Sequence, residues 1–329
     1  MRTIHHICIL GGTGFVGQSL VARLAKTGRT ITVLTRRPER HRSLQVNPGV
    51  KLIKADIHDE ETLVKHFRPA DAVINLVGIL AESRRHSFYN VHFELARKVM
   101  QSCWKADVTR LLHMSALNAD AGRGASMYLH TKGEAEDMLH VDAGDDLHVT
   151  RFRPSVIYGS NDSFFNRFAS LLRLSPVVFP LACPKTRFAP VYVEDVAEAF
   201  VATLEDKSSF GQRYDLCGPQ SYTLNELVTM TAEYIGSNSL IIPLGNFFSQ
   251  LQAFFLGMLP GKPFTLDNYH TLQFDSVCEE NGLIQLGIQP APLEVVVPRY
   301  LGRSFQRAKY DEFRKLANRD EDEYDQANL

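Results

Sequence analysis

The stretch Ile7-Cys-Ile-Leu-Gly-Gly-Thr-Gly-Phe-Val-Gly17 joins a short apolar run to a cluster of glycines, and apolar residues then recur at helical spacing up to Gly28. This order predicts a strand, a tight turn and a helix. Glycines at positions 11, 14 and 17 permit the turn, let backbone N–H groups approach a pyrophosphate, and allow the helix to pack closely on the strand. The helix N-terminus favours an anion, so the stretch predicts a dinucleotide-binding turn.

Short apolar strands alternate with helical patterns after this turn. The further strands are expected over residues 31–34, 50–53, 72–76, 110–114 and 147–152, and the helices over 60–67, 90–105 and 126–140. This alternation predicts right-handed crossovers and an α/β, Rossmann-type doubly wound parallel sheet covered on both faces. Beyond residue 155 it loosens, which predicts a smaller, partly interleaved C-terminal lobe. We therefore expect a cofactor domain over 1–155, a substrate or partner lobe over 156–318 and a disordered acidic tail over 319–329.

Composition narrows the class of protein. The 329 residues carry 36 Lys and Arg against 37 Asp and Glu, a net charge of −1, which lacks the positive field of a nucleic-acid binder. The five cysteines are scattered and odd in number, which argues against a disulfide framework and against a zinc site, and no other metal site is predicted. The apolar pattern starts at Ile4, leaving no room for a signal peptide, so we expect a cytoplasmic protein.

The end of the second predicted strand indicates which dinucleotide is bound. An acid that binds the ribose is usual about 20 residues after the glycine turn, but the sequence there reads Leu34-Thr-Arg-Arg-Pro38. Guanidinium groups can bind a 2′-phosphate that a carboxylate would repel, so Arg36 and Arg37 favour NADP(H) over NAD(H). The alternative is a solvated basic loop that also holds Arg40 and Arg42.

A candidate catalytic set follows in the middle of the chain. Tyr128 and Lys132 stand four residues apart in Ser126-Met-Tyr-Leu-His-Thr-Lys132, on one face of a predicted helix. A nearby ammonium stabilises a phenolate, so Tyr128 could exchange a proton with a carbonyl or an alcohol. Ser115 ends a predicted strand, at the sheet edge where α/β proteins bind ligands, and its hydroxyl is expected to hold the substrate oxygen.

These features resemble one enzyme superfamily. Together with Arg153-Pro-Ser-Val-Ile-Tyr-Gly159 and Val191-Tyr-Val-Glu-Asp195, they are similar to the short-chain dehydrogenase/reductase superfamily in its extended or atypical branch, over nearly the whole chain. Residues 164–168, 174–177, 186–191 and 260–269 resemble, more narrowly, the group related to the nucleotide-binding accessory subunit nine of respiratory complex I. The resemblance implies a Rossmann fold holding NADP(H). It leaves two functions open: an oxidoreductase or epimerase using Tyr, Lys and Ser, or a catalytically silent accessory or assembly factor for complex I or for ubiquinone synthesis.

The cofactor-binding residues implied position by position are Gly11, Gly12, Thr13, Gly14, Phe15, Val16, Gly17, Arg36, Arg37, Asp56, Ile57, Asn75, Val77, Gly78, Ser115, Tyr128, Lys132 and Pro154. Asp56 and Ile57 would lie at the adenine edge, although Asp56 could instead cap the following turn. Leu76 and Val77 are bulkier than the residues usual after the fourth strand. Asn90 matches an asparagine that relays protons in the superfamily, or it is a helix N-cap.

The second lobe is less specific. Position alone nominates Ser160, Asn161, Asn166, Arg167 and Arg187 for the substrate pocket. Residues 246–259 form an apolar helical pattern with four phenylalanines, which we expect to pack on the core because the pattern lacks Lys or Arg flanks. The alternative is a contact surface for a membrane, a quinone-like ligand or a membrane-complex partner, which would place the protein peripherally at the inner membrane.

Overall fold

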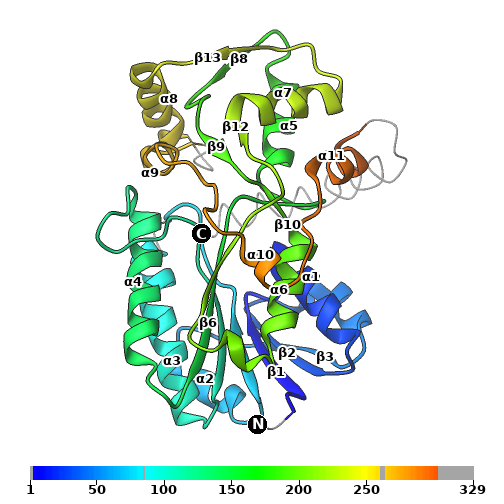
Figure 1. Ribbon diagram of the computed structural model, residues 1–329, viewed down its shortest axis with the longest axis vertical. Coiled ribbons are helices and arrows are strands. Elements are labelled where there is room, and N and C mark those ends of the chain that lie inside the picture. The colour runs from blue at the N-terminus through cyan, green and yellow to red at the C-terminus, as the bar shows by residue number, and fades with distance from the viewer. Residues whose placement is uncertain (1–2, 84–85, 260–263, 303–329) are drawn as a thin grey trace.

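The computed structural model describes residues 3–83, 86–259 and 264–302. The predicted acidic tail over 319–329 and part of the 260–269 stretch lie outside the described residues. Figure 1 shows a larger body built around one sheet, with a smaller lobe at the opposite end from the start of the chain.

One seven-stranded sheet forms the body, and all of its neighbouring strands are parallel. In spatial order it contains β11 (Arg213–Leu216), β6 (His148–Pro154), β5 (Arg110–Met114), β4 (Ala72–Asn75), β1 (His6–Leu10), β2 (Thr30–Thr35) and β3 (Val50–Lys54). The strands β2 and β3 lie on one side of β1, and β4, β5, β6 and β11 lie on its other side, each group in chain order. The carboxyl ends of β1 and β4 therefore form the switch point, where doubly wound sheets bind ligands.

Helices cover both faces of this sheet (Figure 1). The helices are α1 (Phe15–Ala25) and α6 (Val193–Thr203) on one face, and α2 (Glu60–Phe67), α3 (Leu95–Lys105) and α4 (Met127–Asp142) on the other. Alternate residues of β1 face opposite sides, because Ile7 and Ile9 belong to the apolar cluster with α1 and α6, whereas Cys8 and Leu10 belong to the cluster with α2, α3 and α4. The predicted α/β doubly wound fold is confirmed.

The second lobe is built mainly from residues after β6. Its helices are α5 (Phe165–Leu174), α7 (Leu224–Ile235), α8 (Asn246–Met258), α9 (Leu266–Thr271), α11 (Leu293–Val296) and α12 (Pro298–Leu301), whereas the short helix α10 (Gly282–Gln285) packs on β11 of the body. Its strand pairs are β7 (Ile157–Tyr158) with β10 (Val191–Tyr192), β9 (Arg187–Phe188) with β12 (Tyr222–Thr223), and β8 (Val178–Leu181) with β13 (Leu240–Pro243). Because α6 and β11 return from this half to the sheet, the lobe is partly interleaved with the body, as predicted.

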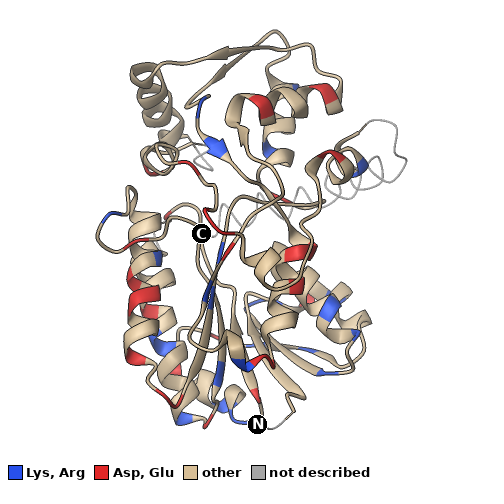
Figure 2. Cartoon of the chain, viewed as in Figure 1, with Lys and Arg blue, Asp and Glu red and all other residues tan. Residues whose placement is uncertain are grey.

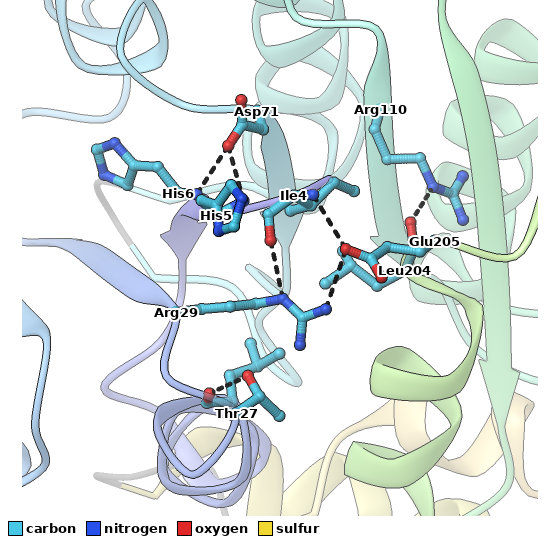
Figure 3. A network of polar contacts seen from close by, with 10 residues as sticks. Ile4, His5, His6, Thr27, Arg29, Asp71, Arg110, Leu204 and Glu205 are labelled. Carbon is cyan, nitrogen blue, oxygen red and sulfur yellow. Dashed lines mark hydrogen bonds and ion pairs between the residues drawn. The ribbon is translucent and has the colours of Figure 1, made fainter. Parts of the chain in front are cut away.

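Polar contacts fix the amino edge of the sheet, which lies opposite the switch point (Figure 3). Glu205 accepts the N–H of Ile4 at 3.0 Å and pairs with Arg29 at 3.1 Å, so the segment before β1 is joined to the segment after α6. Arg110 is fully buried and donates to backbone oxygens such as that of Leu204, at 3.1 Å. These contacts satisfy buried polar groups and leave the other edge of the sheet for ligand chemistry.

The sequence argued against a disulfide framework, but the structure contains a disulfide bond that this argument missed. Cys217 at the end of β11 is bridged to Cys278, which is 61 residues further along the chain. Cys8, Cys103 and Cys183 are free and buried. The bridge was missed because the segment after α9 returns to the end of β11, and cysteine spacing carries no information about that return.

The expected packing of residues 246–259 is also wrong. Helix α8 buries only its small residues Ser249 and Ala253, whereas its large apolar side chains point outward, Phe247 being 70% exposed. Ser249 accepts a hydrogen bond from the N–H of Cys183, at 3.3 Å. Helical spacing predicts an apolar stripe but does not say whether that stripe faces the core, and here the narrow space beneath α8 accommodates small residues.

Candidate functional site

The glycine turn connects β1 to α1 with little room for side chains. A Cβ atom on Gly17 would lie 2.3 Å from the backbone oxygen of Gly11 and 2.5 Å from the Cα of Gly12. Gly11 has a left-handed φ of 77°, which favours glycine, and its oxygen accepts the N–H of Gly14, at 3.0 Å. Gly14 is the N-cap of α1, and no side chain caps this helix. The first N–H groups of α1 therefore lack a side-chain acceptor, as an anion-binding turn requires.

The other residues of the turn shape its walls. Thr13 accepts a hydrogen bond from the side chain of Gln18, at 2.9 Å, through its backbone oxygen. Val16 is buried in the core, whereas Phe15 is half-buried and its ring lies 3.1 Å from where a Cβ atom on Gly159 would be. Phe15 thus packs beside the segment after β6, so the turn is also braced by the second half of the chain.

The predicted 2′-phosphate residues follow β2 directly. Arg36 is exposed, and its Nη1 lies 3.4 Å from Nε2 of His86, while Arg37 is the N-cap of η1 (Pro38–Val46). Asp56, after β3, accepts the N–H of His58 at 2.9 Å and so caps a turn, whereas Asp59 caps α2. Ile57 is half-buried against the core cluster beneath α2. The turn-capping alternative for Asp56 is therefore confirmed, and its predicted adenine contact stays a prediction.

The loop after β4 is held by a buried amide. Asn75 is 2% exposed, its Nδ2 lies 3.2 Å from Nδ1 of His113, and its Oδ1 accepts the N–H of Val77 at 3.1 Å. Both ends of the Asn75 side chain are thus used to position the loop. A Cβ atom on Gly78 would lie 3.2 Å from Nζ of Lys132, so the glycine leaves space beside that ammonium.

Helix α4 carries the predicted Tyr and Lys. Ser126 caps the helix, since its Oγ accepts the N–H of Leu129 at 3.2 Å. Lys132 is 3% exposed and donates to the backbone oxygen of Met114 at 3.0 Å, while burial lowers its pKa to about 8 against an opposing effect of Glu136. Burial, and next the charge of Asp267, raise the pKa of Tyr128 to about 12. Tyr128 is therefore a phenol at neutral pH and can donate a proton.

Ser115 follows the backbone group that Lys132 contacts. Its N–H donates to the backbone oxygen of Phe152 at 2.7 Å, which extends the pairing of β5 with β6. The Ser115 hydroxyl is buried and has no hydrogen-bond partner within the described part of the chain. Buried hydroxyls are nearly always hydrogen-bonded, so an oxygen of a bound ligand fits this position. Pro154 is buried at the end of β6, where its oxygen accepts the N–H of Leu117 at 3.0 Å.

An ion pair anchors α4 to the sheet. Nε of Arg153, on β6, donates to both carboxylate oxygens of Glu136 at 2.8 and 2.7 Å, and its Nη2 donates to the backbone oxygen of Ala119 at 2.8 Å. Glu136 is 1% exposed and lies one helical turn after Lys132. The pair therefore fixes the helix that carries Tyr128 and Lys132.

His92 is a site residue that the sequence did not reveal. It lies on the π-helical turn η2 (Tyr89–Glu94) and is 2% exposed, with its ring centroid 5.3 Å from that of Tyr128. Its Nε2 accepts the N–H of Ile79 at 3.2 Å, so Nδ1 carries the proton and donates to Oγ1 of Thr131 at 3.0 Å. Burial lowers the pKa of His92 to about 2, so the ring is neutral. His92 thus joins the loop after β4 to α4.

Asn90 is not the cap that one sequence interpretation proposed. It is exposed within η2, and its N–H donates to Oγ of Ser87 at 3.2 Å, so Ser87 caps this turn. A π turn often occurs at functional sites, and here it directs His92 inward. The only sequence signal was a histidine two residues after Asn90, within an apolar helical pattern.

The second lobe reaches α4 through α9. Oδ1 of Asp267 accepts the N–H of Met127 at 2.7 Å, and Thr271 donates to Oγ of Ser126 at 2.8 Å. Oδ2 of Asp267 is buried without a partner among the residues described. Asp267 was not singled out in the sequence, because only the fold brings its carboxylate to the first turn of α4.

The substrate residues nominated by position make contacts within their own lobe. The side chain of Asn166 donates to the backbone oxygen of Ser160 at 3.2 Å, and Arg187 donates to Oγ of Ser221 at 2.7 Å. Asn161 and Arg167 are exposed. These contacts neither support nor contradict a substrate role, which stays a prediction.

Residues 3–83, 86–259 and 264–302 contain neither a membrane-spanning helix nor a cluster of metal ligands. None of the helices there combines the length and the hydropathy that a membrane span requires. Within the same ranges, no three His, Cys, Asp or Glu side chains are grouped closely enough to bind a metal ion.

Comparisons with known proteins agree with this architecture. Residues 7–217 match the NAD dependent epimerase/dehydratase family. The chain is 29% identical to mouse NADH dehydrogenase [ubiquinone] 1 alpha subcomplex subunit 9, mitochondrial, over 87% of this chain and 77% of that protein. It is 27% identical to the ceramide reductase of Caulobacter vibrioides, over 72% of this chain and 73% of that protein.

A solved structure supports the fold independently. The NADPH-dependent quinone oxidoreductase QOR2 of Escherichia coli, complexed with NADPH, superposes with a TM-score of 0.71 at 20% identity, over 87% of this chain and 96% of that one. The family and this fold support binding of a nicotinamide dinucleotide, and the resemblance to the group around subunit nine is confirmed. The chain belongs to the NAD dependent epimerase/dehydratase family.

Proposed function

We propose that this protein binds NADP(H) and reduces a carbonyl group to an alcohol. The observation that carries the proposal is the arrangement at the end of β5. The unpartnered buried hydroxyl of Ser115 directly follows Met114, whose oxygen holds Lys132, and Tyr128 precedes Lys132 by one turn of α4. A hydroxyl lacking a partner, a phenol that keeps its proton and a buried ammonium are the groups that carbonyl reduction requires.

Each group has a distinct role in the proposed reaction. Bound NADPH supplies the hydride, and the glycine turn and the N-terminus of α1 would hold its pyrophosphate. Ser115 Oγ–H would donate a hydrogen bond to the carbonyl oxygen and orient it. Tyr128 would give its phenolic proton to that oxygen, and the ammonium of Lys132 would stabilise the phenolate that remains, before solvent returns the proton.

The protonation of Tyr128 supports carbonyl reduction as the proposed reaction. A raised pKa keeps the proton on the phenol, which suits an acid in reduction better than a base in oxidation or epimerisation. His92 and Asn75 position the loop beside Lys132, which on this proposal faces the cofactor. Leu76 and Val77 in this loop are bulkier than the residues usual after the fourth strand. Leu76 is buried and Val77 is half-buried.

A substrate survey tests this proposal. The purified full chain is incubated with NADPH and, separately, a quinone, small aldehydes and ketones, and a ketone of the ceramide type, the last because a relative is named as a ceramide reductase. Loss of NADPH absorbance matched by alcohol or quinol product in mass spectra is the expected result with at least one of them. Tight NADPH binding without turnover of any would contradict the proposal and favour the accessory role.

The preference for NADP(H) is part of the proposal and rests on Arg36 and Arg37. We expect NADPH to bind about tenfold or more tightly than NADH, since a charge-assisted hydrogen bond contributes roughly 1.5–3 kcal/mol. The change Arg36→Asp should reverse the preference, as measured by nucleotide fluorescence titration. Arg42→Asp is the matched control, because it makes the same charge change on another exposed residue of the basic loop. Equal affinities of the wild type for both nucleotides would remove the 2′-phosphate role.

The second candidate function is a catalytically silent accessory or assembly factor for respiratory complex I or the ubiquinone-synthesis machinery. The observation that favours it is the outward apolar face of α8, which suits a partner or a quinone-like ligand. The likeness to a subunit of NADH dehydrogenase also supports it. On either function we propose a cytoplasmic protein that lies peripherally at the inner membrane, with residues 246–259 as its contact region.

A further inference from the structure

Helix α8 is turned with its large apolar side chains outward. Seven side chains along it and at its end are between 41% and 70% exposed: Phe247, Phe248, Leu251, Phe254, Phe255, Met258 and Leu259. Polar side chains on this outward part are few, with Asn246 and Gln250 uncharged and exposed. An exposed aromatic surface of this kind in a folded protein indicates a site of contact.

The β8–β13 strand pair extends this apolar surface. Gln252 of α8 donates to the backbone oxygen of Pro180 on β8, at 3.1 Å, and the N–H of Leu244 after β13 donates to the oxygen of Leu181, at 2.9 Å. The exposed apolar side chains here are Leu174, Val177, Val178, Leu240 and Ile242. We call α8 with β8 and β13 the tip surface, since Figure 1 shows them at the end of the molecule farthest from the start of the chain.

The charged residues of the segments that build the tip surface are basic. The described residues 173–188, 234–259 and 264–266 contain Arg173, Lys185 and Arg187 and no Asp or Glu, while Glu233 and Asp267 adjoin these segments. The rest of the chain is net acidic, because the whole carries −1. In Figure 2, α8, β8 and β13 are neither red nor blue. Lys185 is exposed two residues after Cys183, whose N–H contacts Ser249 of α8, so the fold supplies a basic neighbour that the helix sequence lacks.

We propose that the tip surface docks on an anionic lipid bilayer, with α8 lying in the plane of the interface. A bilayer accepts bulky apolar side chains without requiring hydrogen-bond partners, and anionic head groups attract the basic rim. A protein–protein interface usually carries several direct hydrogen bonds, and the outward face of α8 offers few donors or acceptors. This docking is independent of the proposed redox chemistry, since none of its residues belongs to the site around Tyr128.

Vesicle flotation of the full chain tests the proposal. Wild-type protein should float with phosphatidylcholine vesicles that contain phosphatidylglycerol, and more weakly with phosphatidylcholine alone. The triple variant Phe247→Ser, Phe254→Ser, Phe255→Ser should lose about tenfold or more of its vesicle affinity, because the removed rings supply most of the apolar contact. The matched triple Val46→Ser, Trp104→Ser, Val141→Ser removes exposed apolar side chains from the body and should bind as wild type. Lys185→Glu should weaken binding to anionic vesicles only.

Three results would overturn the proposal. One is absence of wild-type flotation with anionic vesicles, and another is equal flotation of the phenylalanine variant. The third is a concentration-dependent dimer in light scattering that is absent in the phenylalanine variant and persists when vesicles are added. Such a dimer would assign the tip surface to a second copy of this chain. Equal binding to neutral and anionic vesicles, unaffected by Lys185→Glu, would contradict the part assigned to charge. NADPH affinity, measured in parallel, should be the same for every variant.

Discussion

Replacing Gly17 by alanine is expected to weaken NADPH binding by about 100-fold or more, because the added side chain would displace the turn whose N–H groups are proposed to hold the pyrophosphate. The added Cβ would lie 2.3 Å from the oxygen of Gly11 and 2.5 and 2.6 Å from the Cα and carbonyl carbon of Gly12. All three contacts are with backbone atoms, so no side chain can rotate away. The turn itself must move, and its N–H groups move with it.

The measurement is NADPH fluorescence titration, with thermal unfolding monitored on the same samples. Gly245→Ala is the matched control, since a Cβ atom there meets nothing within 4 Å and its φ of −72° suits alanine. The control should bind NADPH as wild type does. The expected 100-fold loss corresponds to about 2.7 kcal/mol of binding free energy. If the Gly17 variant is folded and binds NADPH within about threefold of wild type, the turn is not the pyrophosphate site.

Local sequence pattern was sufficient to predict the body of the fold. The helix expected over 60–67 is α2, and the strand expected over 110–114 is β5, with the same bounds. Periodicity succeeds here because a buried parallel strand needs a continuous apolar run and a covering helix needs an apolar stripe, and both requirements are local.

Pairings between distant segments could not be predicted in this way. The strand β11 joins the sheet beside β6 from far along the chain, and Cys278 comes to Cys217 through the segment after α9. The direction of the α8 apolar face was predicted wrongly for a related reason. Which stripe of a helix is buried depends on the space beneath it, and that space is set by the loop containing Cys183, on another part of the chain.

The candidate site likewise contains residues that local spacing predicts and residues that only the fold brings together. Tyr128, Lys132 and the glycines could be found because their spacing along the chain is itself the signal. His92 and Asp267 act through tertiary contacts, one bridging Ile79 to Thr131 and the other reaching the first turn of α4. Neither residue lies at a diagnostic spacing, so only the fold identifies them as neighbours of Tyr128.

Replacing Tyr128 by phenylalanine is expected to lower turnover of the substrate identified in the survey by about 100-fold or more, the usual contribution of a positioned general acid. The ring contacts with Phe88 and His92, at centroid distances of 5.9 and 5.3 Å, do not involve the hydroxyl, so the variant should fold and bind NADPH normally. Tyr89→Phe is the matched control, because Tyr89 is exposed on η2. Turnover of the Tyr128 variant above about a tenth of wild type would exclude Tyr128 as the proton donor.

The pH dependence separates the two groups on α4. Burial lowers the pKa of Lys132 to about 8, so its ammonium is present below that pH and is lost as the pH rises through it. Tyr128 keeps its proton to about pH 12, so a fall in wild-type turnover near pH 8 reports loss of the Lys132 charge and not loss of the proton donor. Any residual turnover of the Tyr128 variant forms no phenolate for Lys132 to stabilise. The turnover rate of the Tyr128 variant should therefore not decline near pH 8. If the decline is retained, Lys132 does not act by stabilising the Tyr128 phenolate.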